Sequence, residues 1–212
     1  TLLDFYTVLK ELGTLDGLTW LIVGDLEYGR TVHSLVRGIQ KFSGNRVIGF
    51  PVGGLSLVGE YKPDGYEEFD FSKLAQIASE LDPKSLAVLY ATRVQFERIA
   101  RKRYPDHDKF EEARKRQIRD EIYREFKYQI TLEMLNASPE KIKLLPPLPR
   151  GSEIDNEIFY SHNPKVAPIE QMRYGLQVTM AYLALFSGQE EALYHPENFV
   201  VSQPVTFVKS RN

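Results

Sequence analysis

The chain has 212 residues, 42% of them hydrophobic, which is enough for one large domain or two small ones with a buried core. Its 27 basic and 29 acidic side chains give a formal net charge of −2, so no overall positive field favours nucleic acid or an anionic membrane surface. The lack of cysteine excludes disulfides, thiol nucleophiles and thiolate metal sites. The most apolar late stretch, residues 178–186, is too short to span a bilayer, and no signal-peptide pattern is present. We therefore expect a soluble chain, cytoplasmic by default.

The first predicted element is an amphipathic helix over residues 1–12. Four apolar side chains recur on one face of it: Leu2, Phe5, Leu9 and Leu12. Complete domains usually begin with a polar lead-in, whereas this sequence begins inside a helix. This start predicts that a further N-terminal segment belongs to the same protein.

A β-α-β unit follows the first helix. It consists of an apolar run at residues 18–23, a helix pattern from about 31 to 42, and the stretch RVIGFPV at 46–52. Two strands joined by a crossover helix require a parallel sheet.

The later elements continue this alternation. We predict a loop at residues 53–69, a helix at 71–81 and a strand at 86–92. A short strand at 142–145, a last helix at 169–186 and an irregular tail at 187–212 complete the chain. Such alternation predicts the α/β class: an open, mainly parallel, doubly wound (Rossmann-like) sheet with helices on both faces.

Residues 99–127 differ in composition, because charged side chains of both signs dominate them. Four apolar residues interrupt the charges at roughly helical intervals: Phe110, Ile118, Ile122 and Phe126. The pattern predicts one long surface helix that carries many salt bridges and one narrow apolar stripe. A solvated face is the first interpretation of its charges, and a partner-binding or regulatory helix is the alternative.

The exits of three predicted strands carry unusual loops. They read GDLEYGR at 24–30, TRVQFER at 92–98 and PPLPR at 146–150. Ligands of open α/β sheets bind beyond the carboxyl ends of the strands, where Arg30, Arg93 and Gln95 are expected. Two guanidinium groups and an amide can bind a small dianion, because arginine grips carboxylates in a bidentate manner.

Other ligand classes have weaker support. The first strand exit is neither a G-x-G-x-x-G fingerprint nor a P-loop, which argues against a dinucleotide-binding domain. The histidines are widely separated, at His33, His107, His162 and His195. Their spacing does not match a metal site, so we predict no metal and no cofactor.

Three segments carry a family resemblance: GDLEYGRTVHSL, LYATRVQFER and LLPPLPRGSEI. In this order and spacing they resemble the aspartate-binding half of aspartate carbamoyltransferase over about residues 1–188. The TRVQxER block distinguishes these enzymes from ornithine transcarbamylases. The resemblance implies transfer of a carbamoyl group from carbamoyl phosphate to the α-amine of L-aspartate, in de novo pyrimidine biosynthesis.

The resemblance also implies roles for individual residues. Arg30 and Arg93 match arginines that bind the aspartate carboxylates, and Gln95 lies beside them. Arg98 matches a residue that joins the two domains by salt bridges when they close.

The proline-rich loop has an implied role of its own. Leu148 and Pro149 match a family loop whose backbone carbonyls face the substrates. The reaction needs no metal and no covalent intermediate, since catalysis comes from positioning two substrates and stabilising an oxyanion.

The sequence departs from the family pattern at several places. Glu27 stands where the family has lysine, Pro146 replaces a histidine, and Thr179 replaces an arginine. The region between Arg98 and Tyr128 is longer than the family loop. These departures support an alternative, a degenerate transcarbamylase-like domain with an assembly or regulatory role.

The family's first domain, which binds carbamoyl phosphate, has no match in this sequence. The chain by itself is therefore expected to be inactive, and carbamoyl phosphate is expected to bind through that other domain. The resemblance implies a homotrimer for the full-length enzyme, with L-aspartate as the ligand of this half.

Overall fold

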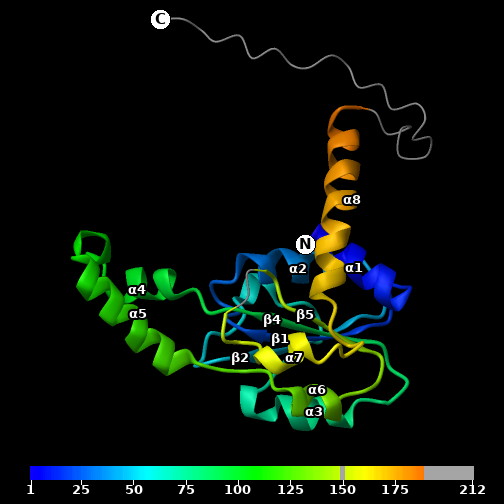
Figure 1. Ribbon diagram of the computed structural model, residues 1–212, viewed down its shortest axis with the longest axis horizontal. Coiled ribbons are helices and arrows are strands. Elements are labelled where there is room, and N and C mark those ends of the chain that lie inside the picture. Colours follow the sequence, from blue (N-terminus) through cyan, green and yellow to red (C-terminus); the bar gives the residue numbers. More distant parts are fainter. Residues whose placement is uncertain (149–150, 189–212) are drawn as a thin grey trace, which may run out of the picture.

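The structure is a computed structural model that describes residues 1–148 and 151–188 (Figure 1). Within these residues, five parallel strands form one sheet in the order β3-β2-β1-β4-β5. The strands are β1 Thr19–Gly24, β2 Arg46–Pro51, β3 Glu67–Glu68, β4 Ala87–Thr92 and β5 Ile142–Leu145. Residues 189–212 of the tail predicted at 187–212 lie outside the described residues, as does Pro149, for which a role was predicted.

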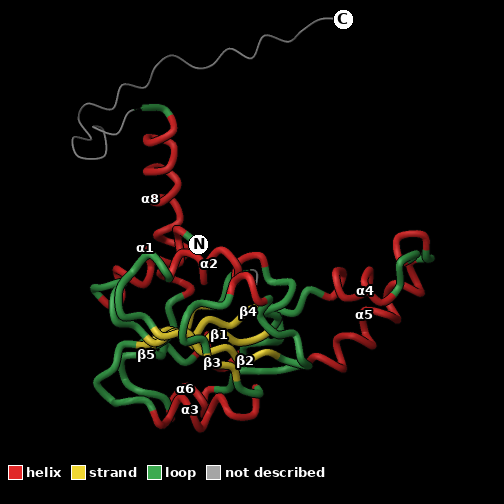
Figure 2. The backbone as a smooth tube through the Cα atoms, turned by 180° about the vertical axis from the view of Figure 1, so that it is seen from behind, coloured by secondary structure: helices red, strands yellow, loops and turns green. Residues whose placement is uncertain are grey.

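Helices cover both faces of the sheet (Figures 1 and 2). On one face lie α1 (Leu2–Leu12), α2 (Arg30–Ile39) and α8 (Pro168–Phe186), and on the other lie α3 (Leu74–Glu80) and α6 (Leu132–Ala137). The remaining helices are α4 (Phe96–Arg103), α5 (Glu112–Phe126) and α7 (Asn156–Tyr160), with 3₁₀ turns η1 (Gly59–Tyr61), η2 (Phe71–Lys73) and η3 (His107–Lys109). The predicted doubly wound architecture is confirmed.

The central strands are buried on both faces, which explains their continuous apolar sequence. Along β1, Trp20 and Ile22 enter the core beneath α1 and α2, while Leu21 and Val23 enter the core on the α3 side. This alternation follows from the two-residue period of a strand. Trp20 is completely buried.

The exits of β1 and β4 are forced together at Gly24. Gly24 pairs with Thr92 in register and has φ of 116°, a conformation that side-chain-bearing residues rarely adopt. A Cβ atom at Gly24 would lie 2.0 Å from the carbonyl oxygen of Thr92. Only glycine therefore permits the two exits to approach this closely.

The prediction of one long helix over residues 99–127 is wrong. The segment forms parts of two helices, α4 and α5, which pack against each other as a hairpin projecting from the carboxyl edge of the sheet (Figure 1). Pro105 explains the break, because proline disfavours helical geometry in the residue before it, and Tyr104 ends α4 in an extended conformation. The expected apolar stripe is present, since Ile118, Ile122 and Phe126 are buried.

Three shorter differences concern local structure. The predicted loop at 53–69 contains η1 and the edge strand β3, and the predicted helix at 71–81 begins with η2. The two helices α6 and α7 were not predicted, because a helix of five or six residues shows too little periodicity to be recognised.

The apolar face predicted for α1 is only partly buried. Phe5 lies in the core, but Leu2 and Leu9 are exposed. The side of α1 that is buried includes Asp4, whose carboxylate accepts a hydrogen bond of 2.7 Å from the Gln171 amide of α8. Within the described part of the chain, no helix is both long and apolar enough to cross a membrane.

Candidate functional site

A pocket of about 200 Å³ lies at the exits of β1 and β4, and we call it the strand-exit pocket. Its lining consists of Arg30, Thr31, Thr92, Arg93, Gln95, Arg98, Pro147 and Leu148. The structure thus gathers the predicted residues Arg30, Arg93, Gln95, Arg98 and Leu148 around one hollow. Pro149 is outside the described residues.

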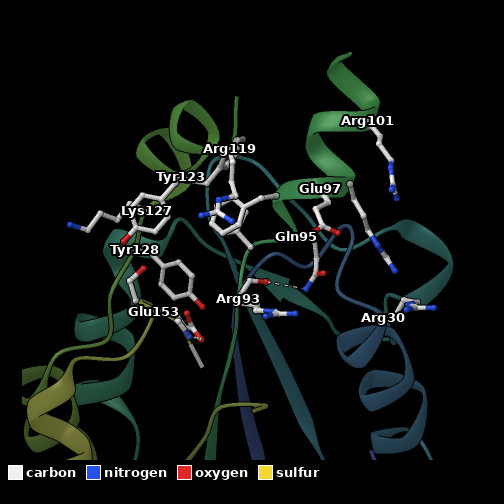
Figure 3. Close-up of a pocket in the computed structure, with 16 residues that line it drawn as sticks. Arg30, Arg93, Gln95, Glu97, Arg101, Arg119, Tyr123, Lys127, Tyr128 and Glu153 are labelled. Carbon is white, nitrogen blue, oxygen red and sulfur yellow. Dashed lines mark hydrogen bonds between the residues drawn. The ribbon is translucent and has the colours of Figure 1, made fainter. Parts of the chain in front are cut away.

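Two arginines supply the positive charge of this pocket. Arg30 is the first residue of α2 and Arg93 follows β4 directly. The Arg93 side chain extends toward Arg30, and Gln95 Nε2 lies 3.5 Å from the Arg93 carbonyl oxygen (Figure 3). Neither guanidinium has an ion pair or a hydrogen bond to any described residue, and both residues are exposed. Their charges are therefore available to an anion that enters the pocket.

A buried carboxylate joins the two loops that carry these residues. Asp25 is fully buried; its Oδ1 accepts a hydrogen bond of 2.8 Å from the Tyr28 N–H, and its Oδ2 accepts one of 2.9 Å from the Gln95 N–H. Burial raises the pKa of Asp25, against the lowering effect of the two backbone donors. One side chain thus fixes the Arg30 loop relative to the Gln95 loop.

No pattern in the sequence indicates this role of Asp25. Asp25 follows a strand and accepts from the backbone three residues later, which is ordinary turn chemistry. Its bond to Gln95 depends on the neighbouring strand, which no local pattern reveals.

Two basic residues of α4 contact the turn that contains Glu27 and Tyr28. Arg98 Nη1 donates a hydrogen bond of 2.6 Å to the Tyr28 carbonyl, and Lys102 Nζ lies 2.8 Å from Glu27 Oε1. Lys102 also lies 5.4 Å from the centre of the Tyr28 ring. The hydrogen bond to Glu27 raises the pKa of Lys102. The reversed charge at Glu27 is thus matched by a lysine within this chain.

A second hollow of about 510 Å³ adjoins the first, and we call it the α5 pocket. It shares Arg30, Arg93, Gln95 and Arg98 with the strand-exit pocket and is bounded on its far side by α5 and residues 151–153. No sequence pattern predicted that α5 or residues 151–153 would line a pocket beside Arg30 and Arg93. That omission follows from the wrong expectation of a single surface helix.

Two buried polar side chains form the inner wall of the α5 pocket. The Tyr128 hydroxyl donates a hydrogen bond to the Thr92 carbonyl, and burial raises the pKa of Tyr128 well above its usual value. This phenol is therefore a protonated donor at neutral pH. Glu153 Oε1 accepts a hydrogen bond of 2.7 Å from the Gly151 N–H. The Tyr128 hydroxyl thus fixes the backbone at Thr92, and the Glu153 carboxylate fixes the backbone at Gly151.

His33 performs a packing role near the site. Its Nε2 lies 3.0 Å from the Leu26 carbonyl oxygen, and its ring stacks on Tyr61 with centroids 4.0 Å apart. In the described ranges, no group of three or more His, Cys, Asp or Glu side chains is arranged to hold a metal ion.

The architecture and the site together define a class of protein: a parallel α/β domain with an arginine-lined pocket at adjacent strand exits, where open α/β sheets bind their ligands. Comparison with known families is more specific. Residues 16–186 match the family model described as aspartate/ornithine carbamoyltransferase, Asp/Orn binding domain, and the chain belongs to this family.

Individual relatives agree with this assignment. The chain is 33% identical over 184 residues to the aspartate carbamoyltransferase catalytic subunit of Archaeoglobus fulgidus, covering 87% of this chain and 54% of that protein. It is 36% identical over 189 residues to the multifunctional protein pyr-3 of Neurospora crassa, covering 86% of this chain and 9% of that protein. The chain thus spans about half the length of the catalytic subunit that it matches.

Solved structures show the same relationship. The catalytic subunit of aspartate transcarbamoylase from M. jannaschii superimposes with a TM-score of 0.61 at 29% identity, over 93% of this chain and 56% of that one. Aspartate transcarbamoylase from Trypanosoma cruzi in complex with phosphate gives a TM-score of 0.65 at 27% identity, over 85% and 55%. The resemblance inferred from three sequence motifs is confirmed.

Proposed function

We propose that residues 1–188 form the aspartate-binding half of an aspartate carbamoyltransferase. The observation that carries this proposal is the position of Arg30 and Arg93, which have no side-chain partner among the described residues, together with Gln95 around a pocket of about 200 Å³. L-aspartate has two carboxylates, and two guanidinium groups suit them because arginine binds carboxylates through two parallel N–H donors.

In this proposal the domain positions aspartate and a second domain binds carbamoyl phosphate. The neutral α-amine of aspartate attacks the carbonyl carbon of carbamoyl phosphate. The new C–N bond forms, the C–O bond to phosphate breaks, and the leaving phosphate accepts the proton that the amine loses. The backbone carbonyls of Leu148 and Pro149 face the substrates, and Arg98 takes part in domain closure. Holding two reactants in the correct orientation supplies much of the rate enhancement in such a reaction.

An exposed apolar surface supports the existence of a second domain. Leu9 of α1 and Met172, Leu176 and Leu183 of α8 are all exposed. Exposed apolar patches of this kind mark surfaces for further protein contacts. We propose that a carbamoyl-phosphate-binding domain covers this surface in a cytoplasmic, homotrimeric enzyme. Sedimentation of the full-length protein tests the trimer.

The function is tested by measuring N-carbamoyl-aspartate formed from labelled aspartate by three proteins. These are the chain alone, the chain fused behind a carbamoyl-phosphate-binding domain of this family, and the same fusion with Arg93→Ala. We expect turnover only from the second protein. Turnover by the chain alone would contradict the division of roles, and a folded but inactive fusion would favour the alternative of a degenerate domain.

A further inference from the structure

The α5 pocket is larger than the strand-exit pocket, and five arginines line it: Arg30, Arg93, Arg98, Arg101 and Arg119. The proposed reaction gives no role to Arg119. Arg119 of α5 lines this pocket, and its side chain extends from the helix toward Arg93 and Gln95 (Figure 3). We propose that Arg119 forms an additional anion subsite, which binds the third carboxylate of a tricarboxylate whose other two carboxylates occupy the strand-exit pocket. The inference rests on the proposed function, because it takes Arg30 and Arg93 as the dicarboxylate site.

Arg119 has no counter-charge among residues 1–148 and 151–188. Its side chain has no ion pair or hydrogen bond with any residue in the described part of the chain. On the same hairpin Arg101 pairs with Asp108 at 3.0 Å and Lys115 pairs with Glu112 at 3.0 Å. Arg114 and Arg116, like Arg119, have no such partner among the described residues, but they do not line the α5 pocket. The charge of Arg119 is therefore free for a ligand.

Basic side chains outnumber acidic ones in the lining of the α5 pocket. Its basic lining residues are Arg30, Arg93, Arg98, Arg101, Arg119 and Lys127. Its acidic lining residues are Glu97 and Glu153, and one oxygen of Glu153 already accepts from the Gly151 N–H. Clustered like charges repel one another, and an anion that binds among them relieves this repulsion.

The helix that carries Arg119, α5, is held against α4 and the core. Both guanidinium Nη atoms of Arg103 lie 2.6 Å from the carboxylate oxygens of Glu125, and the rings of Phe96 and Tyr123 lie 5.8 Å apart. Ile118, next to Arg119, is fully buried. A bidentate ion pair and a buried anchor together preorganise the helix, which lowers the entropic cost of binding a ligand there.

Lys127 does not belong to this subsite although it lines the same pocket. Its side chain extends away from Arg93 and from Arg119 (Figure 3). The subsite thus contains one guanidinium, which matches one additional carboxylate.

Two ligands that share a four-carbon dicarboxylate unit test the proposal. Succinate has two carboxylates, and tricarballylate carries the same unit with one further carboxymethyl group. Calorimetric titrations at low ionic strength compare both ligands on the 212-residue chain, on Arg119→Gln, and on Arg124→Gln as the control. Arg124 is exposed on the same helix but does not line the pocket.

We expect tricarballylate to bind the unmodified chain about tenfold more tightly than succinate, the gain typical of one charge-assisted contact. Arg119→Gln should remove this difference and leave succinate affinity unchanged, while Arg124→Gln should change neither. Equal affinities for the two ligands in the unmodified chain would overturn the proposal, as would equal weakening of both by Arg119→Gln. Arg119-dependent binding of tricarballylate without succinate binding would support the subsite and contradict the proposed aspartate site.

Discussion

Asp25 and Gln95 connect the two loops of the strand-exit pocket through a hydrogen bond of 2.9 Å between the carboxylate Oδ2 and the backbone N–H. The other oxygen of Asp25 holds the backbone of Tyr28, so one fully buried side chain spans both loops. The separation of Arg30 from Arg93 therefore depends on a residue that touches neither guanidinium.

Replacing Asp25 with asparagine should weaken both stability and binding. An amide offers one oxygen and one NH₂ group, so one of the two backbone donors loses its acceptor, which costs about 1–3 kcal/mol. Urea denaturation measures the loss of stability, and titration with succinate measures the loss of affinity. Unchanged succinate affinity in a measurably destabilised variant would show that Asp25 supports the fold without positioning the site.

Replacing Arg93 with alanine should abolish most succinate binding. Loss of one bidentate guanidinium contact to a carboxylate costs about 2–3 kcal/mol. The control is Arg46→Ala, because Arg46 is partly exposed and pairs with Glu67 far from the pocket. Calorimetry should show the loss in Arg93→Ala and full affinity in Arg46→Ala. Full affinity in both variants would remove Arg93 from the site.

Two glycine-to-alanine substitutions should distinguish the stability cost of a steric clash between strands from the cost of a left-handed backbone conformation. Gly24→Ala brings a Cβ against the Thr92 carbonyl, while Gly13, also at positive φ, has open space around it. Alanine at Gly13 should cost about 1 kcal/mol for the left-handed conformation. Alanine at Gly24 should cost at least about 3 kcal/mol because the strands must separate as well. Urea denaturation curves give both values, and equal losses would contradict the close packing of β1 against β4.

The ion pair between Glu27 and Lys102 should tolerate an exchange of charges. Glu27→Lys places two lysines together, and Lys102→Glu places two carboxylates together, so each change should be destabilising. The double variant restores an attractive pair, and its partly exposed position limits the coupling energy to about 0.5 kcal/mol. A double-mutant cycle of unfolding free energies measures this coupling. A coupling energy of zero would show that the pair does not fasten α4 to the turn.

Acid should loosen the helical hairpin through Glu125. The hydrogen bond from Arg103 lowers the pKa of Glu125 from its ordinary value of 4.5. A lowered pKa in the folded state means that the contact stabilises the hairpin above about pH 4.5 and that this contribution is lost as the pH falls through the folded-state pKa.

Amide hydrogen exchange of α5, corrected for intrinsic rates, measures this effect. Protection should fall below pH 4.5 in the unmodified chain. Glu125→Gln should show a smaller fall, because it cannot ionise while Asp108 and Glu112 of the same hairpin, whose pKa values are also lowered by ion pairs, still do. An identical pH profile in the two proteins would contradict the role of this ion pair.

The sequence by itself determined four of the five strands in the described residues, the doubly wound fold and the family. Continuous apolar runs such as β4 can only be buried on both faces, which specifies a parallel sheet with two helical layers. Arg30, Arg93 and Gln95 were predicted because the carboxyl ends of parallel strands share one edge of a sheet. Both inferences depend on local pattern and on a general rule of topology.

Tertiary structure decided the features that require contacts between distant segments. The bond from Asp25 to Gln95 exists because β1 and β4 are neighbours, and Arg119 reaches the pocket because the chain turns at Pro105 and returns as α5. The exposure of Leu9 on α1 depends on which side of the helix α8 covers. Periodicity specifies which residues share a face, but only packing determines which face is buried and which side chains meet across it.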